Sequence, residues 1–117
     1  MRILILEDDP FIASDLQSIL EDEGHEVVGV FDSIAETYQH LEDEFDYALL
    51  DIDVVGGKSF GVANALAERS IPFAFVSASK PGDLPQSLRE VAFIPKPFEE
   101  RAILQSIDSS SSRSYSC

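Results

Sequence analysis

The stretch Ile3-Leu4-Ile5-Leu6-Glu7-Asp8-Asp9-Pro10 decides how this chain folds. Four apolar residues of strand type lead directly into three acids and a proline. An Asp–Pro pair is a good helix start, because aspartate caps the first turn and proline suits its first position. The stretch therefore predicts a buried strand that ends in carboxylates and passes at once into a helix.

Three later segments also run from apolar residues into a polar one: Ala48-Leu49-Leu50-Asp51, Phe73-Ala74-Phe75-Val76-Ser77 and Phe93-Ile94-Pro95-Lys96. In a parallel α/β sheet the carboxyl ends of the strands share one edge, and ligands bind there. The polar side chains expected to converge on one pocket at that edge are Glu7, Asp8, Asp51, Ser77 and Lys96. Clustered carboxylates repel one another unless a cation lies among them, and an all-oxygen cluster suits Mg²⁺.

The whole chain reads as five strand–helix units. The predicted strands are Arg2–Leu6, Val27–Val30, Tyr47–Leu50, Pro72–Val76 and Ala92–Pro95. The predicted helices are Pro10–Glu23, one that is capped by Ser33 and carries Ile34, Tyr38 and Leu41, Ser59–Arg69, and Glu99–Ile107. Five such units with short loops predict a flavodoxin-like α/β fold, a doubly wound parallel sheet of order 2-1-3-4-5 with helices on both faces.

Two segments depart from this regular pattern. Lys80–Pro85 is a loop by composition, and Gln86–Glu90 allows little more than one helical turn, so we expect the fourth helix to be short or poorly formed. Gly56-Gly57 also reads as a loop. The domain is expected to span residues 1–107, and residues 108–117 read as a serine-rich flexible tail.

Composition narrows the class of function. The chain has 117 residues, 44% of them hydrophobic, which fits one domain with a real core. Its net charge of −14 argues against binding to nucleic acid or to an anionic membrane, since both need a basic surface. No apolar run approaches the roughly 18 residues of a membrane span. Cys117 is the only cysteine, so no internal disulfide can form, and we expect a cytoplasmic protein.

The order of these motifs resembles the response-regulator receiver domain of two-component signalling, over about residues 1–107. The matching residues are Glu7-Asp8, Asp51, Ser77-Ala78 and Lys96-Pro97-Phe98, each at the end of a predicted strand. In addition, Pro72-Phe73-Ala74-Phe75 followed by a hydroxyl resembles a subgroup known from alphaproteobacterial single-domain regulators. That subgroup has a reduced fourth helix.

The resemblance implies a phosphoacceptor rather than a separate enzyme. Asp51 would take a phosphoryl group from a sensor histidine kinase or a histidine phosphotransfer protein, and the domain would assist its own phosphorylation and dephosphorylation. The resemblance also implies a Mg²⁺ ion, and its ligands would be Glu7, Asp8, Asp51 and the backbone carbonyl of Asp53.

The resemblance further implies roles for residues around the phosphoryl group. Ser77 would bond its oxygens, Lys96 would pair with them, and Phe93 lies at the position of the family's switching aromatic. The Lys96–Pro97 peptide would be cis. The first helix and the loop after the fifth strand form the family's kinase-docking surface, so the candidate contacts are Phe11, Ile12 and Pro97.

The chain differs from the family pattern at several positions. Ser77 replaces the commoner threonine, and the loop after Asp51 lacks the usual proline before glycine. Asp53 adds a carboxylate near the site, which we expect to tighten metal binding and to alter the lifetime of the phosphorylated state. Because the fourth helix is reduced, we do not expect the family's usual dimer in its usual form, and we expect a monomer or a weak dimer.

Taken singly, each candidate has an ordinary explanation. Asp8 and Asp9 suit a helix cap, Ser77 a turn, Lys96 a solvated charge and Phe93 the core. Together they favour a stand-alone receiver that signals by protein contact or acts as a phosphate sink. The alternatives are a pseudo-receiver that binds partners without phosphorylation, a different enzyme on this fold such as a metal-dependent phosphatase, and a receiver cut from a longer protein.

Overall fold

The computed structural model describes the backbone through residue 115 and the side chains through residue 109. Its centre is a five-stranded parallel sheet of order β2-β1-β3-β6-β7. The strands of this sheet are β1 (Arg2–Leu6), β2 (Glu26–Phe31), β3 (Tyr47–Leu50), β6 (Phe73–Ser77) and β7 (Ala92–Pro95). The order is the predicted 2-1-3-4-5, because β4 and β5 belong to a separate hairpin.

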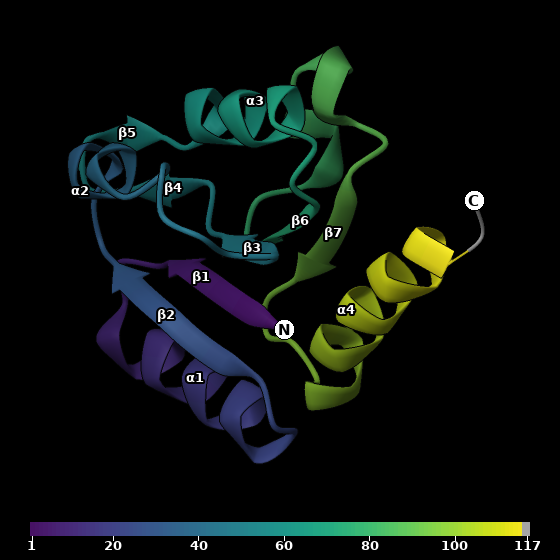
Figure 1. The fold of residues 1–117 in the computed structure, drawn as a ribbon. Helices are drawn as coiled ribbons and strands as arrows, with labels where there is room; N and C mark the ends of the chain where they lie inside the picture. Colours follow the sequence, from purple (N-terminus) through teal and green to yellow (C-terminus); the bar gives the residue numbers. More distant parts are fainter. Residues whose placement is uncertain (116–117) are drawn as a thin grey trace.

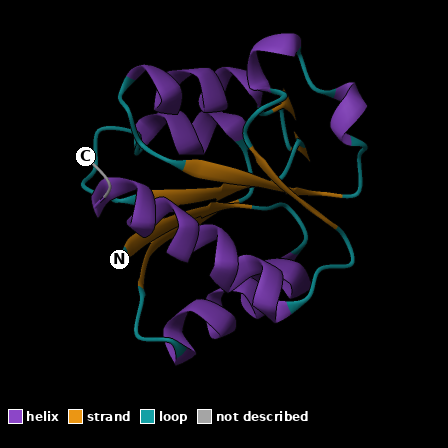
Figure 2. Ribbon diagram, turned by 90° about the vertical axis from the view of Figure 1, so that its right-hand side faces the viewer, coloured by secondary structure: helices purple, strands orange, loops and turns teal. Residues whose placement is uncertain are grey.

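Helices cover both faces of this sheet (Figure 1 and Figure 2). One face carries α1 (Pro10–Asp22) and α4 (Glu100–Tyr115). The other face carries α2 (Ile34–Gln39) and α3 (Phe60–Glu68). The predicted fold class is therefore confirmed.

Strand side chains alternate between two hydrophobic layers. Leu4, Leu6 and Leu50 pack toward the face of α2 and α3. Ile3, Ile5 and Leu49 pack toward α1 and α4. Because both faces are covered, the central strands are apolar at nearly every position, as buried parallel strands are.

Local signals explain where the first two helices begin and end. The Asp9 side chain accepts the backbone N–H of Phe11 at 2.9 Å and so caps α1. Gly24 follows the helix with a φ of +87°, a conformation that suits glycine. The Ser33 hydroxyl accepts the N–H of Glu36 and caps α2. This helix ends at Gln39, so the buried Leu41, which we expected on it, lies beyond its end.

The loop after β3 contains a hairpin that we did not expect. β4 (Asp53–Val54) and β5 (Gly57–Lys58) pair in antiparallel fashion. Gly56 and Gly57 have φ values of 102° and 126°, which lets the chain reverse within two residues. Val55 at the tip also bonds the loop after β2, donating to Asp32 and accepting from Ile34. Strands of two residues are too short to show a sequence period, so the segment read only as a loop.

The connection between β6 and β7 is reduced, as expected, and the short or poorly formed fourth helix is replaced by 3₁₀ turns. It contains two single 3₁₀ turns, η1 (Pro81–Asp83) and η2 (Gln86–Leu88). Leu84 and Leu88 are each 2% exposed and join the core on the face of α2 and α3. These two side chains fill part of the layer that a complete fourth helix would otherwise cover.

The last helix is longer than predicted. We expected Glu99–Ile107, whereas α4 runs from Glu100 to Tyr115 and includes most of the serine-rich segment. Serine has only moderate helix propensity, so the composition alone did not indicate the extension. Ser116 and Cys117, the end of the expected flexible tail, lie outside the described residues. Among the helices that the structure describes, none is long and apolar enough to cross a membrane.

We predict that Leu88→Ala will lower the free energy of unfolding by about 2–5 kcal/mol, because it opens a cavity in the core. Gln86→Ala, an exposed change in the same 3₁₀ turn, is the matched control and should cost far less. Urea denaturation measures both. Equal effects of the two changes would show that Leu88 does not anchor this segment.

Candidate functional site

Three carboxylates meet at the carboxyl edge of the sheet. Glu7 and Asp8 follow β1, Asp51 follows β3, and the two strands are neighbours in register, with Leu6 opposite Leu50. The Asp51 N–H continues this pairing by donating to the Leu6 carbonyl at 2.8 Å. One carboxylate oxygen from each of the three acids lies within 4.8 Å of the others. Glu7 and Asp51 are buried, while Asp8 is exposed.

Lys96 reaches the same point from the end of β7. Its backbone N–H donates to the Ser77 carbonyl at 2.9 Å, which extends the pairing of β6 and β7 to the sheet edge. Its Nζ lies 2.5 Å from Glu7 Oε1 and 3.2 Å from Asp51 Oδ2. The Lys96–Pro97 peptide is cis. The structure thus brings four of the five residues expected to converge into one cluster: Glu7, Asp8, Asp51 and Lys96.

The second carboxylate oxygen of Asp51 is held by the backbone. Asp51 Oδ1 accepts the N–H of Ile52 at 2.8 Å. The main-chain carbonyl of Asp51 accepts the hydroxyl of Ser59 at 2.6 Å. We did not identify Ser59 from the sequence, since a serine before a helix usually caps that helix. Here its side chain makes no capping bond.

Ser77 and Asp53 are linked through Ser79 in the loop after β6. The buried Ser77 hydroxyl accepts the N–H of Ser79 at 3.2 Å. The Ser79 hydroxyl donates to Asp53 Oδ2 at 3.3 Å. Asp53 Oδ1 accepts from Lys58 in the hairpin, and this hydrogen bond lowers the pKa of the exposed Asp53 carboxyl. The carboxylate of Asp53 therefore faces Lys58 and Ser79, and no sequence signal had indicated these two partners.

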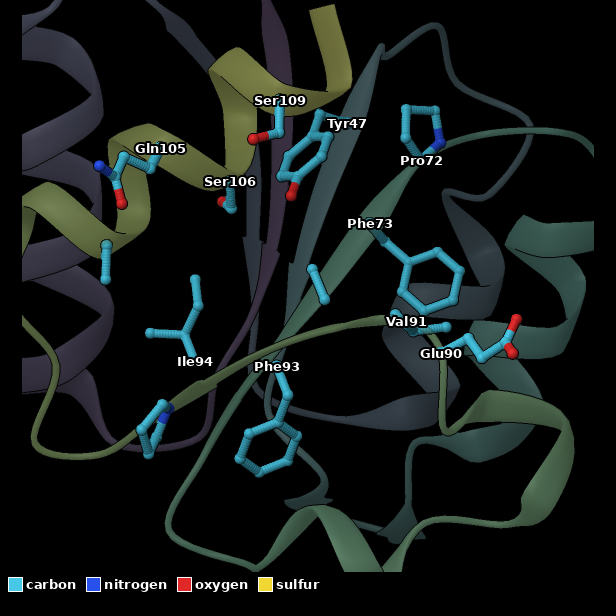
Figure 3. Close-up of a pocket in the computed structure, with 13 residues that line it drawn as sticks. Tyr47, Pro72, Phe73, Glu90, Val91, Phe93, Ile94, Gln105, Ser106 and Ser109 are labelled. Atoms are coloured by element: carbon cyan, nitrogen blue, oxygen red, sulfur yellow. The ribbon is translucent and has the colours of Figure 1, made fainter. Parts of the chain in front are cut away.

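Phe93 lines a groove at the edge strand β7 (Figure 3). The groove runs between β7 and α4, and its lining includes Phe73, Val91, Ala102 and Gln105. Phe93 is half-buried and packs toward the core layer of α2 and α3. Ile94 points to the opposite side of β7. Phe93 is therefore partly in the core and partly at a surface groove.

The cluster carries more negative charge than one lysine balances. Burial raises the pKa of Glu7 to about 7, although its hydrogen bonds with Lys96 and Asp9 act in the opposite direction. Burial alone would lower the pKa of Lys96, but the hydrogen bond to Glu7 and the charge of Asp51 outweigh it and raise that pKa. Lys96 is therefore protonated, and Glu7 keeps its proton to a higher pH than an ordinary glutamate does.

These residues fit a hard divalent cation. Three carboxylate oxygens within ligand distance of one another form an all-oxygen donor set, which is what Mg²⁺ prefers. Burial makes the Glu7 carboxylate costly to ionise and raises its pKa, and a cation beside it would favour the ionised form. Asp8 is exposed, so an ion at this point would keep contact with water, as Mg²⁺ usually does.

Comparison with known proteins gives consistent relatives. The family model of the response regulator receiver domain matches residues 3–108. The phyllosphere-induced regulator PhyR of Methylorubrum extorquens is 34% identical over an alignment of 103 positions, and the match covers 84% of this chain and 39% of PhyR. The transcriptional regulatory protein PdtaR of Mycobacterium tuberculosis is 28% identical over an alignment of 117 positions, and the match covers 96% of this chain and 57% of PdtaR. The chain therefore spans less than two thirds of the length of each of these relatives.

Solved structures of receiver-type regulators also resemble this chain in fold. The solution structure of SdrG from Sphingomonas melonis superposes with a TM-score of 0.83 at 34% identity, and covers 95% of this chain and 96% of that one. The receiver domain of HemR from Leptospira biflexa, in its non-phosphorylated form, gives a TM-score of 0.78 at 27% identity, with coverage of 93% and 92%.

We predict that, without metal, the free energy of unfolding contains a Glu7 contribution that falls as pH rises from about 4.5 to about 7. Between these values the unfolded chain releases the Glu7 proton while the folded chain retains it, so rising pH favours unfolding. The contribution lost is up to about 3 kcal/mol. Urea denaturation of Glu7→Gln in a chelating buffer should show a pH dependence that is flatter by this amount.

The matched control for this measurement is Asp8→Asn, which removes a charge from an exposed acid of the same cluster. The free energy of unfolding of Asp8→Asn should decline with rising pH as that of the wild-type chain does. Parallel profiles for Glu7→Gln and the wild-type chain would contradict the assignment of this titration to Glu7.

Proposed function

Since the chain belongs to the response-regulator receiver-domain family, we propose that it accepts a phosphoryl group on Asp51 and transmits a signal through it. The observation that carries this proposal is the setting of the Asp51 carboxylate. It lies at the sheet edge between a protonated lysine and two further acids that fit a divalent cation. A nucleophile beside groups that balance charge is what phosphoryl transfer requires.

The donor in this proposal is a phosphohistidine of a sensor kinase or a phosphotransfer protein. A carboxylate oxygen of Asp51 forms the new O–P bond while the N–P bond of the phosphohistidine breaks. The electron pair of that bond goes to the imidazole nitrogen, which then takes up a proton. The product is an aspartyl phosphate, and its later hydrolysis by water regenerates the carboxylate.

Each neighbouring residue has a distinct part in this proposal. Lys96 already contacts Asp51 and balances charge on the phosphoryl oxygens. Ser77 offers a hydroxyl to the same oxygens from the end of β6. The acids that would hold Mg²⁺ are Glu7, Asp8 and Asp51, and the family resemblance adds the backbone carbonyl of Asp53. When bound, the ion would supply positive charge against the oxygens of the transferring group.

Phosphorylation would add about −1.5 to −2 charges at the sheet edge. We propose that Ser77 and the loop after it move toward this charge, and that Phe93 changes rotamer in response. The half-buried position of Phe93 beside an open groove supports two alternative placements. Phosphorylation would then shift the population between two conformations, and a partner would read that shift.

We propose a cytoplasmic receiver that signals by protein contact or acts as a phosphate sink. The second candidate is a pseudo-receiver that binds partners without being phosphorylated. The complete set of Asp51, Lys96 and paired acids favours the first. Whether a longer natural protein contains this chain is a separate matter, because the curated relatives extend well beyond the matched region.

The phosphodonor is expected to dock at the start of α1. Phe11 is 86% exposed there, in the first turn after the acidic pair. Residues 1–46 also hold fourteen of the 22 acidic residues but only one of the eight basic ones. Among these acids, Asp8, Asp9 and Asp15 are exposed and lie within four residues of Phe11. An exposed aromatic close to acidic residues suits a partner with an apolar pocket and a basic rim. Ile12 and Pro97 are the neighbouring candidate contacts.

We predict one phosphoryl adduct when the purified chain is incubated with Mg²⁺ and a small-molecule phosphodonor, as measured by intact mass. Asp51→Asn removes the nucleophile while it preserves the size of the side chain, so it should give no adduct. A chelator should also abolish the adduct in the wild-type chain. The absence of an adduct with both a small-molecule and a protein donor would favour the pseudo-receiver.

We predict that Phe11→Ala slows phosphotransfer from a phosphorylated histidine protein roughly tenfold or more, because it removes an interface anchor. The rate with a small-molecule phosphodonor should stay unchanged, since that donor needs no docking surface. Tyr38→Ala, a change at an exposed aromatic on α2, is the control. Equal slowing with both donors would instead place Phe11 in the chemistry of the site.

A further inference from the structure

Ser59 is a buried serine whose hydroxyl is turned away from the helix it precedes. It is the last residue before α3 and is 0% exposed. Its backbone N–H donates to the Ile52 carbonyl at 2.9 Å, and its hydroxyl donates to the Asp51 carbonyl at 2.6 Å. Both bonds close the loop of residues 52–58 against the end of β3, where Asp51 lies.

The hydroxyl acts on a peptide group that also holds the Asp51 side chain. The Asp51 carbonyl and the Ile52 N–H belong to the same planar peptide unit. That N–H donates to Asp51 Oδ1 at 2.8 Å, in a buried position. A chain of two hydrogen bonds therefore runs from the Ser59 hydroxyl through one rigid peptide to the carboxylate. Bonds linked in this way polarise and strengthen one another.

The two oxygens of the Asp51 carboxylate are bonded by groups that differ greatly in conformational freedom. Oδ2 contacts Lys96, whose long side chain has many rotamers. Oδ1 contacts the Ile52 N–H, whose direction is fixed once its peptide plane is fixed. The orientation of the carboxylate therefore depends on the plane of this peptide, and Ser59 is the side chain that bonds the other end of that plane.

We propose that Ser59 is a positioning residue for phosphoryl transfer to Asp51. It fixes the Asp51–Ile52 peptide, and through the Ile52 N–H it sets the direction of the carboxylate. This inference rests on the proposed function, since it concerns the phosphoacceptor itself. It adds a residue whose hydroxyl bonds the main chain of Asp51 and not its carboxylate, and that acts only through the backbone.

A purely structural role would differ in its consequences. If Ser59 only closed the loop, its removal would lower stability without altering the reactivity of molecules that remain folded. If Ser59 positions the carboxylate, its removal lowers the phosphorylation rate of the folded chain. It also changes the hydrogen bonding of one amide, that of Ile52. These two readouts separate the roles.

The test compares Ser59→Ala with the wild-type chain at a temperature where circular dichroism shows that both are fully folded. We expect phosphorylation by a small-molecule phosphodonor in saturating Mg²⁺ to slow roughly tenfold, since small misplacements of a reacting group are costly. We also expect the Ile52 amide proton to shift in NMR spectra of the metal-free chain and to lose protection from hydrogen exchange. Ser59→Thr, which retains the hydroxyl, should restore both readouts.

The matched control is Ser106→Ala. The Ser106 hydroxyl also donates to a backbone carbonyl, that of Ile103 at 2.7 Å, but it lies on α4. This change should leave the phosphorylation rate and the Ile52 amide unaltered. An unchanged rate or an unchanged Ile52 amide in Ser59→Ala would overturn the inference while leaving the proposed function intact. A wild-type chain that accepts no phosphoryl group would overturn the proposed function, and the inference with it.

Discussion

The ammonium group of Lys96 lies between two buried carboxylates, and the arrangement of the sheet edge depends on this contact. Glu7 and Asp51 follow neighbouring strands, so their charges are forced together wherever the chain folds in this register. Taking charges out of water is costly, and a single lysine offsets only part of that cost. The raised pKa of Glu7 reflects the part of this cost that Lys96 does not offset. A cation among these acids would offset the same imbalance, which is what would give it affinity for this point.

The sheet and most of the site could be predicted from the sequence because they follow from periodicity and strand ends. The runs before Glu7, Asp51, Ser77 and Lys96 are strongly apolar, and parallel topology then brings their ends to one edge. The hairpin after Asp51 and the contacts of Ser59 could not be predicted. Strands of two residues have no readable period, and a serine before a helix has the same sequence signature whether it caps that helix or bonds elsewhere. The length of α4 was missed for a related reason, since serine composition does not separate helix from coil.

Hydrogen bonds join the loops around the site into a connected rim. The hairpin bonds the loop after β2 through Val55, and it bonds the loop after β6 through Asp53 and Ser79. The Ser59 hydroxyl, at the base of the hairpin, donates a hydrogen bond to the Asp51 carbonyl. Charge placed on Asp51 would therefore act on several loops at once, although those loops are far apart in the sequence.

The two 3₁₀ turns between β6 and β7 limit how far a movement at this rim can spread along the chain. A complete α-helix after β6 would behave as a stiff rod, so a displacement at Ser77 would be carried along its whole length. Here the chain makes separate short turns, and Leu84 and Leu88 pin it to the core at two points. A movement of Ser77 would therefore displace the backbone of only the next few residues. The surface that changes shape would then be small and close to Asp51, so a partner that senses the change would have to bind beside the site itself.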